Sequence, residues 1–245
     1  MAAHSKIEWT QSTWNPWHGC TKISPGCKFC YMFRDKERYG QDGSVVVRSK
    51  TTFSDPLKWK EPRTIFTCSW SDFFHEAADE WRAEAWNIIA QTPQHTYLIL
   101  TKRINRVAKE VEAPMRGSLV DISFPDNVIL GVSVESARYK SRIALLQKVP
   151  VKRRFISFEP LIAPIASNDP FDPKGIHWAI VGAESGSTAN ARPMELEWAR
   201  DVRDKCQQFK IPFFMKQICV NGKPIPFEKF PDDLKIRQMP EGIAA

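Results

Sequence analysis

Hydrophobic and polar positions along the chain form a repeated pattern, in which a short apolar run is followed by a stretch with helical spacing. The apolar runs are continuous rather than alternating, which is typical of parallel strands buried on both faces. They predict strands at residues 64–68, 95–100, 128–132, 154–156, 177–181 and 212–215. Helical spacing predicts helices at residues 31–39, 80–90, 105–111, 137–147 and 196–209. This order of elements predicts an α/β fold with a parallel sheet.

The segments outside this alternation carry weaker patterns. Residues 7–9 are expected to begin a short strand, and residues 41–63 are polar and loop-like. The first helix is expected to end at Gly40, because glycine suits the left-handed backbone that follows many helices. The tail at residues 221–245 is rich in proline, so we expect it to be peripheral, with a frayed end at residues 242–245.

Polar side chains follow every predicted strand at the point where the strand ends. Because the carboxyl ends of parallel strands meet on one face, we expect these side chains to converge on one pocket, as they do in α/β barrels. Helix capping accounts for Ser71 and Ser136, since serine is a preferred cap, but it does not account for the charged residues. The strand-end residues that we expect at this pocket are Ser69, Ser71, Asp72, Lys102, Arg103, Ser133, Glu135, Glu159, Glu184 and Lys216.

Three of the six cysteines lie close together, in a loop at residues 18–31. Cys20, Cys27 and Cys30 have the spacing C-x6-C-x2-C, and the glycine, serine and proline between them favour a curled backbone. Thiolates prefer soft metal centres, and a four-iron cluster normally takes four cysteines. Three cysteines therefore favour an iron–sulfur cluster with one iron left open. Two alternatives stay open, namely a Cys3His zinc site that includes His18 and a set of unrelated buried thiols.

The composition is that of an ordinary globular protein. A chain of 245 residues with 42% hydrophobic and 26% charged residues is consistent with one domain over residues 1–245. No apolar run reaches the length of a membrane span, and the first six residues lack the apolar segment of a signal peptide. We therefore expect a cytoplasmic location and no membrane partner. In that compartment, cysteines act as ligands or free thiols more often than as disulfides.

The charge balance favours a polyanionic partner. The formal net charge is +7, and nucleic acid is the usual partner of such a basic chain. The alternative interpretation is a basic surface that has no such partner. Two groups of basic residues follow the ends of the second and third predicted strands, where they are expected to bind phosphates beside the pocket. The candidate nucleic-acid contacts are Lys102, Arg103, Arg106, Arg138, Lys140 and Arg142.

Several motifs together resemble a known family. Cys27-Lys28-Phe29-Cys30 matches the second half of the C-x3-C-x-aromatic-C motif of radical S-adenosylmethionine (SAM) enzymes, although the first gap is longer. The longer gap resembles that of a phage-associated three-cysteine family of radical-SAM-like proteins. The shared motifs span about residues 7 to 219 and lie at 7–10, 14–16, 100–103, 133–136, 157–161 and 182–186.

The resemblance implies a fold, a cofactor and a set of site residues. The fold would be a partial (β/α)6-type barrel of parallel strands, with the cysteine loop after the first strand. Cys20, Cys27 and Cys30 would ligate a [4Fe–4S] cluster, whose open iron would bind SAM. The residues that would contact SAM are Phe29, Ser69, Ser71, Asp72, Ser133 and Glu135, and the catalytic candidates toward the substrate are Glu159, Glu184, Lys216 and Cys219. Cys68 and Cys219 each have three alternative roles, as a hydrogen-atom donor, a fourth cluster ligand or an inert buried thiol. Cys206 is expected to lie in the core.

The resemblance also implies a reaction. Reductive cleavage of SAM would give a 5′-deoxyadenosyl radical that modifies a nucleic-acid base. The specific modification expected is an isomerisation of a modified thymine in phage DNA. The electron donor would be a flavodoxin or ferredoxin, and a phage-encoded protein would act in the host cytoplasm. Other radical SAM chemistry on RNA, a base-lesion repair lyase and a zinc-bearing nucleic-acid-binding module stay open as alternatives.

Overall fold

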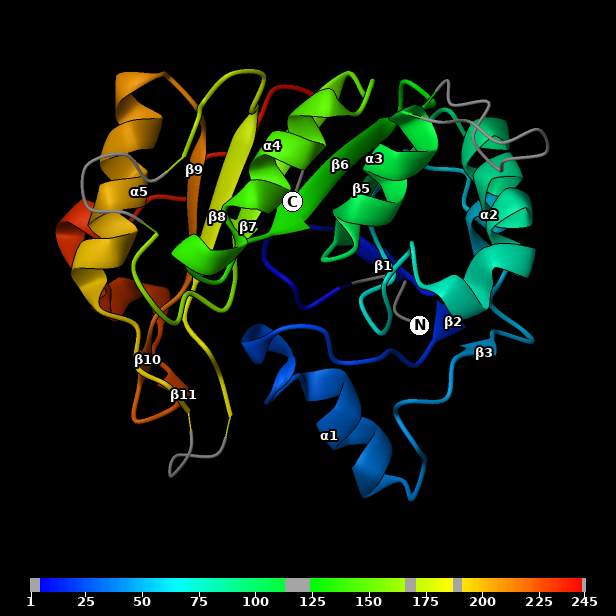
Figure 1. Cartoon of the computed structure of the whole chain (residues 1–245), viewed down its shortest axis with the longest axis horizontal. Helices are drawn as coiled ribbons and strands as arrows, with labels where there is room; N and C mark the ends of the chain where they lie inside the picture. Colours follow the sequence, from blue (N-terminus) through cyan, green and yellow to red (C-terminus); the bar gives the residue numbers. More distant parts are fainter. Residues whose placement is uncertain (1–4, 113–123, 166–170, 187–190, 244–245) are drawn as a thin grey trace.

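The computed structural model describes residues 5–112, 124–165, 171–186 and 191–243, with residues 109–112 described by their backbone alone. Its centre is a sheet of seven parallel strands in the order β1-β4-β5-β6-β7-β8-β9, curled into a half-barrel (Figure 1). The strands are β1 (Ser12–Trp14), β4 (Thr64–Thr67), β5 (Thr96–Thr101), β6 (Val128–Ser133), β7 (Arg153–Phe158), β8 (Trp178–Gly182) and β9 (Phe213–Gln217). All six predicted strands are present and parallel.

The seventh strand, β1, is one that the sequence pattern did not predict. It pairs with β4 at the sheet edge, Ser12 opposite Ile65. The expected strand at residues 7–9 is wrong, because this segment forms bends and a turn instead. A (β/α)6 description is therefore one strand short.

Helices cover the convex face of the sheet (Figure 1). Four of them pack their apolar sides against the strands in one large core, where Ala85, Val107, Leu146 and Val202 are all buried. The expected helix at residues 137–147 is divided into a 3-10 turn at Ala137–Tyr139 and an α-helix, while the other helices agree with prediction. The helices are α1 (Tyr31–Arg38), α2 (Asp79–Gln91), α3 (Ile104–Glu112), α4 (Ser141–Lys148) and α5 (Leu196–Gln208).

The predicted loop at residues 41–63 contains only short elements. Strand β3 (Val47–Arg48) pairs antiparallel with β2 (Trp17–His18), next to the cysteine loop. A 3-10 turn at Asp55–Lys58 follows. Near the other end of the chain, β10 (Cys219–Val220) and β11 (Lys223–Pro224) form a small hairpin.

A second apolar cluster fills the concave face of the sheet. Trp9 from the N-terminal segment and Ile243 from the C-terminal tail close this cluster from outside the sheet. The tail is therefore not peripheral. Its expected fraying is wrong for Ile243, which is only 8% exposed, while residues 244–245 lie outside the described residues. The tail also covers the β9 edge, because Met215 N donates to Ile236 O over 2.7 Å.

Along the strands, the inward-facing positions change from apolar to polar. On β7, Phe155 lies in the inner apolar cluster, whereas Ser157 lines a cavity at the carboxyl end. On β9, Phe214 and Lys216 show the same change. Gly131 on β6 makes room for the Phe155 ring, because a Cβ at this glycine would lie 2.3 Å from the ring. The concave face thus has an apolar floor and a polar mouth.

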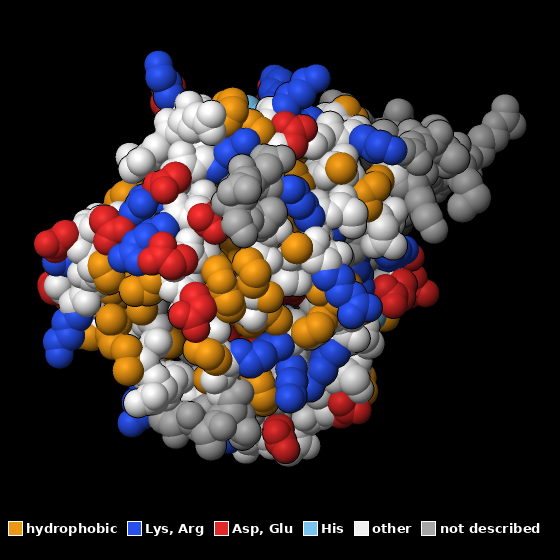
Figure 2. Space-filling view, turned by 60° about the vertical axis from the view of Figure 1, so that its left-hand side comes forward, with side chains coloured by type: hydrophobic (Ala, Val, Ile, Leu, Met, Phe, Trp, Pro, Cys, Tyr) orange, Lys and Arg blue, Asp and Glu red, His pale blue; other side chains and the backbone are white. Residues whose placement is uncertain are grey.

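The surface carries both signs of charge, with acidic and basic side chains interspersed over the upper part of the face in Figure 2. Among the helices that the structure describes, none has the length and apolarity needed to cross a lipid bilayer.

Candidate functional site

A cavity of about 640 Å³ opens at the carboxyl ends of the strands. Its volume is within the range of ligand-binding pockets, roughly 300–1,000 Å³. The structure brings the three cysteines of the loop and most of the expected strand-end side chains to this one cavity. Its lining includes Cys20, Cys27, Phe29, Cys30, Ser69, Ser71, Asp72, Lys102, Arg103, Ser133, Ser157, Glu159, Glu184 and Lys216.

The cysteine loop, residues 18–31, folds as a series of tight turns. Gly19 has a φ of +98°, and a Cβ there would lie 2.1 Å from Val45 O, so only glycine fits. A 3-10 turn at Pro25–Cys27 follows, and Cys30 is the residue immediately before α1. These turns direct all three cysteines toward the cavity that they line.

Burial raises the pKa of the Cys20 thiol to about 12, and it also raises that of Cys30. Without a metal, both thiols are therefore protonated near neutral pH. A soft metal would have to displace these protons in order to bind.

Glu135 anchors the tip of the cysteine loop from the end of β6. Its side chain is fully buried and does not line the cavity. Ser24 Oγ donates to Oε1 over 2.5 Å, Arg142 Nη1 donates to Oε2 over 2.8 Å, and Lys102 Nζ lies 3.4 Å from Oε1. Gly26 packs against the same carboxylate, because a Cβ there would lie 2.5 Å from Glu135 Cγ. The Glu135 carboxylate, which we expected to contact SAM, is engaged with the cysteine loop, Arg142 and Lys102 in this structure.

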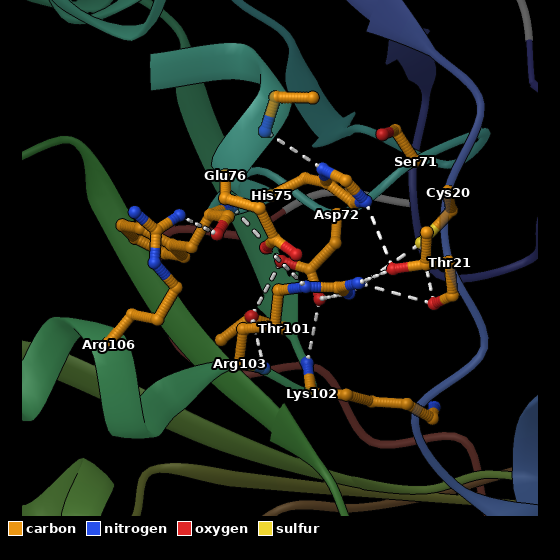
Figure 3. Close-up of polar contacts among 12 residues, drawn as sticks. Cys20, Thr21, Ser71, Asp72, His75, Glu76, Thr101, Lys102, Arg103 and Arg106 are labelled. Carbon is orange, nitrogen blue, oxygen red and sulfur yellow. Dashed lines mark hydrogen bonds and ion pairs between the residues drawn. The ribbon is translucent and has the colours of Figure 1, made fainter. Parts of the chain in front are cut away.

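Asp72 and Arg103 form a second anchor (Figure 3). Asp72 accepts from Thr101 Oγ1 over 2.7 Å and from Lys102 N over 3.0 Å, so its carboxylate is already engaged. The Arg103 guanidinium lies 3.4 Å from Asp72 and donates to Thr21 Oγ1 over 2.6 Å. It also lies 3.6 Å from Cys20 Sγ. Arg103 therefore contacts other protein groups and is only 5% exposed, so it does not face a phosphate at the surface as we expected.

Glu184 and Arg192 form the third anchor. Arg192 Nε donates to Glu184 Oε2 over 3.0 Å, and a second contact joins Arg192 Nη2 to Oε1. Arg192 Nη2 also donates to Pro25 O over 2.9 Å, and the guanidinium lies 5.6 Å from the Phe29 ring. Sequence reasoning missed Arg192, because it lies in a polar segment between elements where no pattern marks it.

The remaining SAM candidates, Phe29, Ser69, Ser71 and Ser133, line the cavity. Asn15 Nδ2 donates to Ser69 Oγ over 3.0 Å, and Ser71 Oγ donates to Gly19 O over 2.6 Å. Ser133 is 3% exposed but lines the cavity, and Phe29 is half-buried there. The structure thus brings these four of the six candidates to one cavity. Phe29 has two cations beside its ring there, the Lys28 ammonium at 5.0 Å and the Arg192 guanidinium at 5.6 Å.

Glu159 and Lys216 form an ion pair inside the cavity. Lys216 Nζ lies 2.7 Å from Glu159 Oε1, and Ser157 Oγ donates to Glu159 Oε2 over 3.2 Å. Gly182 on the strand between them makes the pair possible, since a Cβ there would lie 2.3 Å from Glu159 Oε1. Both charged groups keep part of their surface open to the cavity.

The other cysteines lie in different surroundings. Cys68 is buried, has a left-handed backbone (φ 61°) and lines the cavity. Cys219 lies on β10 and is not part of the cavity lining, while Gln217 Nε2 donates to its sulfur over 3.4 Å. Cys206 is fully buried in α5, so its predicted place in the core is confirmed.

The basic residues expected to contact nucleic acid are not one surface group. Arg142 is buried against Glu135, and Arg106 pairs with Asp79 at 2.8 Å. Lys102 lines the cavity. Arg138 is exposed, and Lys140 is half-buried. Most of these charges are thus neutralised within the fold.

In the described part of the chain, no three or more His, Cys, Asp and Glu side chains are arranged to hold a single metal ion. His18, the fourth ligand of the zinc alternative, lies outside the cavity lining, and Lys36 Nζ is 2.7 Å from its Nδ1. An iron–sulfur cluster binds each cysteine to a different iron, so its ligands need not converge on one point.

The fold and the cavity define an α/β protein with a parallel half-barrel and a three-cysteine loop at the carboxyl mouth. The chain belongs to the family described as protein of unknown function (DUF5131), which matches residues 4–225. No curated protein and no solved structure gives a significant match to the chain.

Proposed function

We propose that this protein is a radical SAM enzyme. The observation that carries the proposal is that three cysteines of one loop line a single cavity at the carboxyl mouth of a parallel half-barrel, beside hydroxyl, carboxylate and ammonium groups from the strand ends. In α/β barrels this mouth is where catalytic groups gather.

The donor set fits a [4Fe–4S] cluster. Cys20, Cys27 and Cys30 supply three soft thiol ligands, one fewer than a fully ligated cluster takes, which leaves one iron for SAM. When bound and reduced, the cluster and SAM together supply a 5′-deoxyadenosyl radical that abstracts hydrogen from carbon. The guanidinium near Cys20 Sγ suits such a site, because hydrogen bonds to ligand sulfurs tune a cluster's potential.

The chain's own residues divide the cavity into two sides. Phe29, Ser69, Ser71 and Ser133 would hold SAM, with the Phe29 ring available for stacking and the hydroxyls for hydrogen bonds. Asp72 and Glu135 would support this side indirectly, since their carboxylates are engaged with the protein.

The Glu159–Lys216 pair would serve the substrate. A carboxylate beside an ammonium group offers a hydrogen-bond acceptor and donors at one place, which suits the polar edge of a nucleic-acid base. A base is therefore the substrate class that we propose, with an isomerisation on a modified thymine of phage DNA as its specific form. A flavodoxin or ferredoxin would supply the electron.

The test begins with the metal. Anaerobically reconstituted protein should contain about four irons and four sulfides per chain, as the composition of a [4Fe–4S] cluster requires, and Cys20→Ala, Cys27→Ala and Cys30→Ala should each abolish this content. Cys206→Ala is the matched control, because that thiol lies in the core away from the cavity. With SAM and dithionite, wild-type protein should release 5′-deoxyadenosine. Full iron and sulfide in all three loop variants would refute the assignment.

A further inference from the structure

Next in sequence to residues that line the cavity lies a group of cations that differs from the basic residues discussed so far. Between Trp9 and Arg34 the sequence contains no Asp or Glu, but it contains Lys22, Lys28 and Arg34. All three are exposed. None forms an ion pair with a carboxylate in the described part of the chain, whereas Arg103, Arg106 and Arg142 all do. Unpaired cations at a cavity mouth form a surface for an anion.

Aromatic rings lie among these cations. Lys22 Nζ lies 4.7 Å from the centre of the Phe33 ring, and Lys28 Nζ lies 5.0 Å from that of Phe29. Both rings also line the cavity. The surface therefore combines positive charge with aromatic faces at the entrance itself.

Arg34 extends this surface across the mouth. A Cβ built on Gly186 would lie 3.8 Å from Arg34 Nη1, so the α1 side chain reaches the segment after β8. That segment contains Ala183, Glu184 and Ser185, which line the cavity. Figure 2 shows Lys and Arg side chains gathered beside hydrophobic ones on the lower part of the face that it draws.

We infer that Lys22, Lys28, Phe33 and Arg34 form a cationic rim that binds single-stranded nucleic acid. Cations that follow a phosphate backbone, combined with rings that stack on bases, are the two features of single-strand binding surfaces. A duplex fits less well, because a base would first have to leave its pair and its stack to enter the cavity. The inference rests on the proposed function for its purpose, the delivery of a base to the cavity, but binding itself is testable without turnover.

The test is fluorescence anisotropy with a labelled 15-nucleotide single strand, using the full chain after anaerobic purification and adding neither SAM nor reductant. Neutralising a phosphate on a single strand contributes about 0.7 to the slope of log affinity against log salt. Three contacts therefore predict a loss of roughly 20-fold in affinity between 50 and 200 mM salt for the wild type. Lys28→Glu/Arg34→Glu should bind at least about tenfold more weakly at 50 mM, and its slope should fall by about 1.4.

The matched control is Lys60→Glu/Lys174→Glu, which changes the net charge by the same amount. Both lysines are exposed and precede β4 and β8, so they lie at the opposite end of the sheet. This variant should bind within about twofold of wild type, since it removes no rim contact. Thermal unfolding and iron content of each variant separate loss of binding from loss of folding.

Three further arms decide the partner. Binding of single-stranded DNA is compared with binding of single-stranded RNA of the same sequence, to show which sugar is preferred. Binding of either strand that is weakened in Lys28→Glu/Arg34→Glu supports the inference. Equal weakening of both double variants would overturn it, as would tighter binding to a duplex or rim-dependent binding to phosphatidylserine vesicles alone. Failure of the proposed function is distinguished by a separate measurement, the release of 5′-deoxyadenosine by the wild-type protein with SAM and dithionite but without oligonucleotide. Its absence would refute the radical SAM assignment without bearing on binding at the rim.

Discussion

Replacing Glu135 with glutamine should loosen the cysteine loop. The carboxylate is fully buried and joins β6 to Ser24 on the loop and to Arg142 on α4. Glutamine keeps the volume, so the contact with Gly26 is unchanged, but it removes the negative charge that faces the Arg142 guanidinium and the Lys102 ammonium group.

Removing one partner of a buried ion pair costs about 3–5 kcal/mol, because the other charge stays buried without compensation. Here Arg142 keeps two other contacts, a hydrogen bond of 2.7 Å to Ser133 O and the Tyr139 ring at 4.3 Å. We therefore expect the lower end, about 3 kcal/mol of unfolding free energy. With a urea m-value of about 2–3 kcal/mol/M, the midpoint should fall by roughly 1–1.5 M.

Urea unfolding of the metal-free protein, followed by tryptophan fluorescence and circular dichroism together, measures this loss if the two transitions coincide. Glu228→Gln, on an exposed side chain, is the matched control and should stay within about 0.5 kcal/mol of wild type. A structural loss anywhere in the protein would also lower the midpoint, so a second measurement is needed at the loop itself. Alkylation of the cysteine thiols should be faster in Glu135→Gln under native conditions, since the loop opens more often. Unchanged midpoint and alkylation rates would refute the anchoring role.

Two other changes probe the same cavity. Gly26→Ala should destabilise the protein by about 1–3 kcal/mol and reduce iron uptake, because its Cβ would lie 2.5 Å from Glu135 Cγ; wild-type values in urea unfolding and iron analysis would contradict the packing. Glu159→Gln and Lys216→Met should keep the basal release of 5′-deoxyadenosine but lose its stimulation by oligonucleotide, measured by chromatography of the nucleoside. If basal release falls as well, the pair serves SAM rather than the substrate.

The fold was largely predictable because its strands are continuous apolar runs. The pattern failed at β1, where three residues, Ser12, Thr13 and Trp14, pair at an edge and carry only one large apolar side chain. It failed also at the tail, where Leu234 and Ile243 are isolated apolar residues among prolines and charges, although both are buried. Burial of a single side chain depends on contacts with distant segments, which local periodicity does not contain.

The candidate site was predictable in place but not in role. Parallel strands bring their ends together, so convergence on one cavity follows from topology alone. Whether a carboxylate faces a ligand or a protein cation depends on partners far along the chain. Ser24 and Glu135 are separated by 111 positions, and Arg192 and Pro25 by 167. No spacing rule in the sequence connects them.

The three anchors hold the cysteine loop in place, whereas a different ion pair faces the cavity. Asp72, Glu135 and Glu184 follow alternate strands, β4, β6 and β8, and each is joined to the cysteine loop. Asp72 acts through Arg103, Glu184 acts through Arg192, and Glu135 accepts from Ser24 directly. Each anchoring carboxylate faces an arginine, so its charge is balanced within the fold. Glu159, which follows β7, instead faces Lys216, and this pair keeps surface open to the cavity. We therefore expect substitutions at the three anchors to change loop stability and cluster content first, and substitutions at the Glu159–Lys216 pair to change substrate selection first.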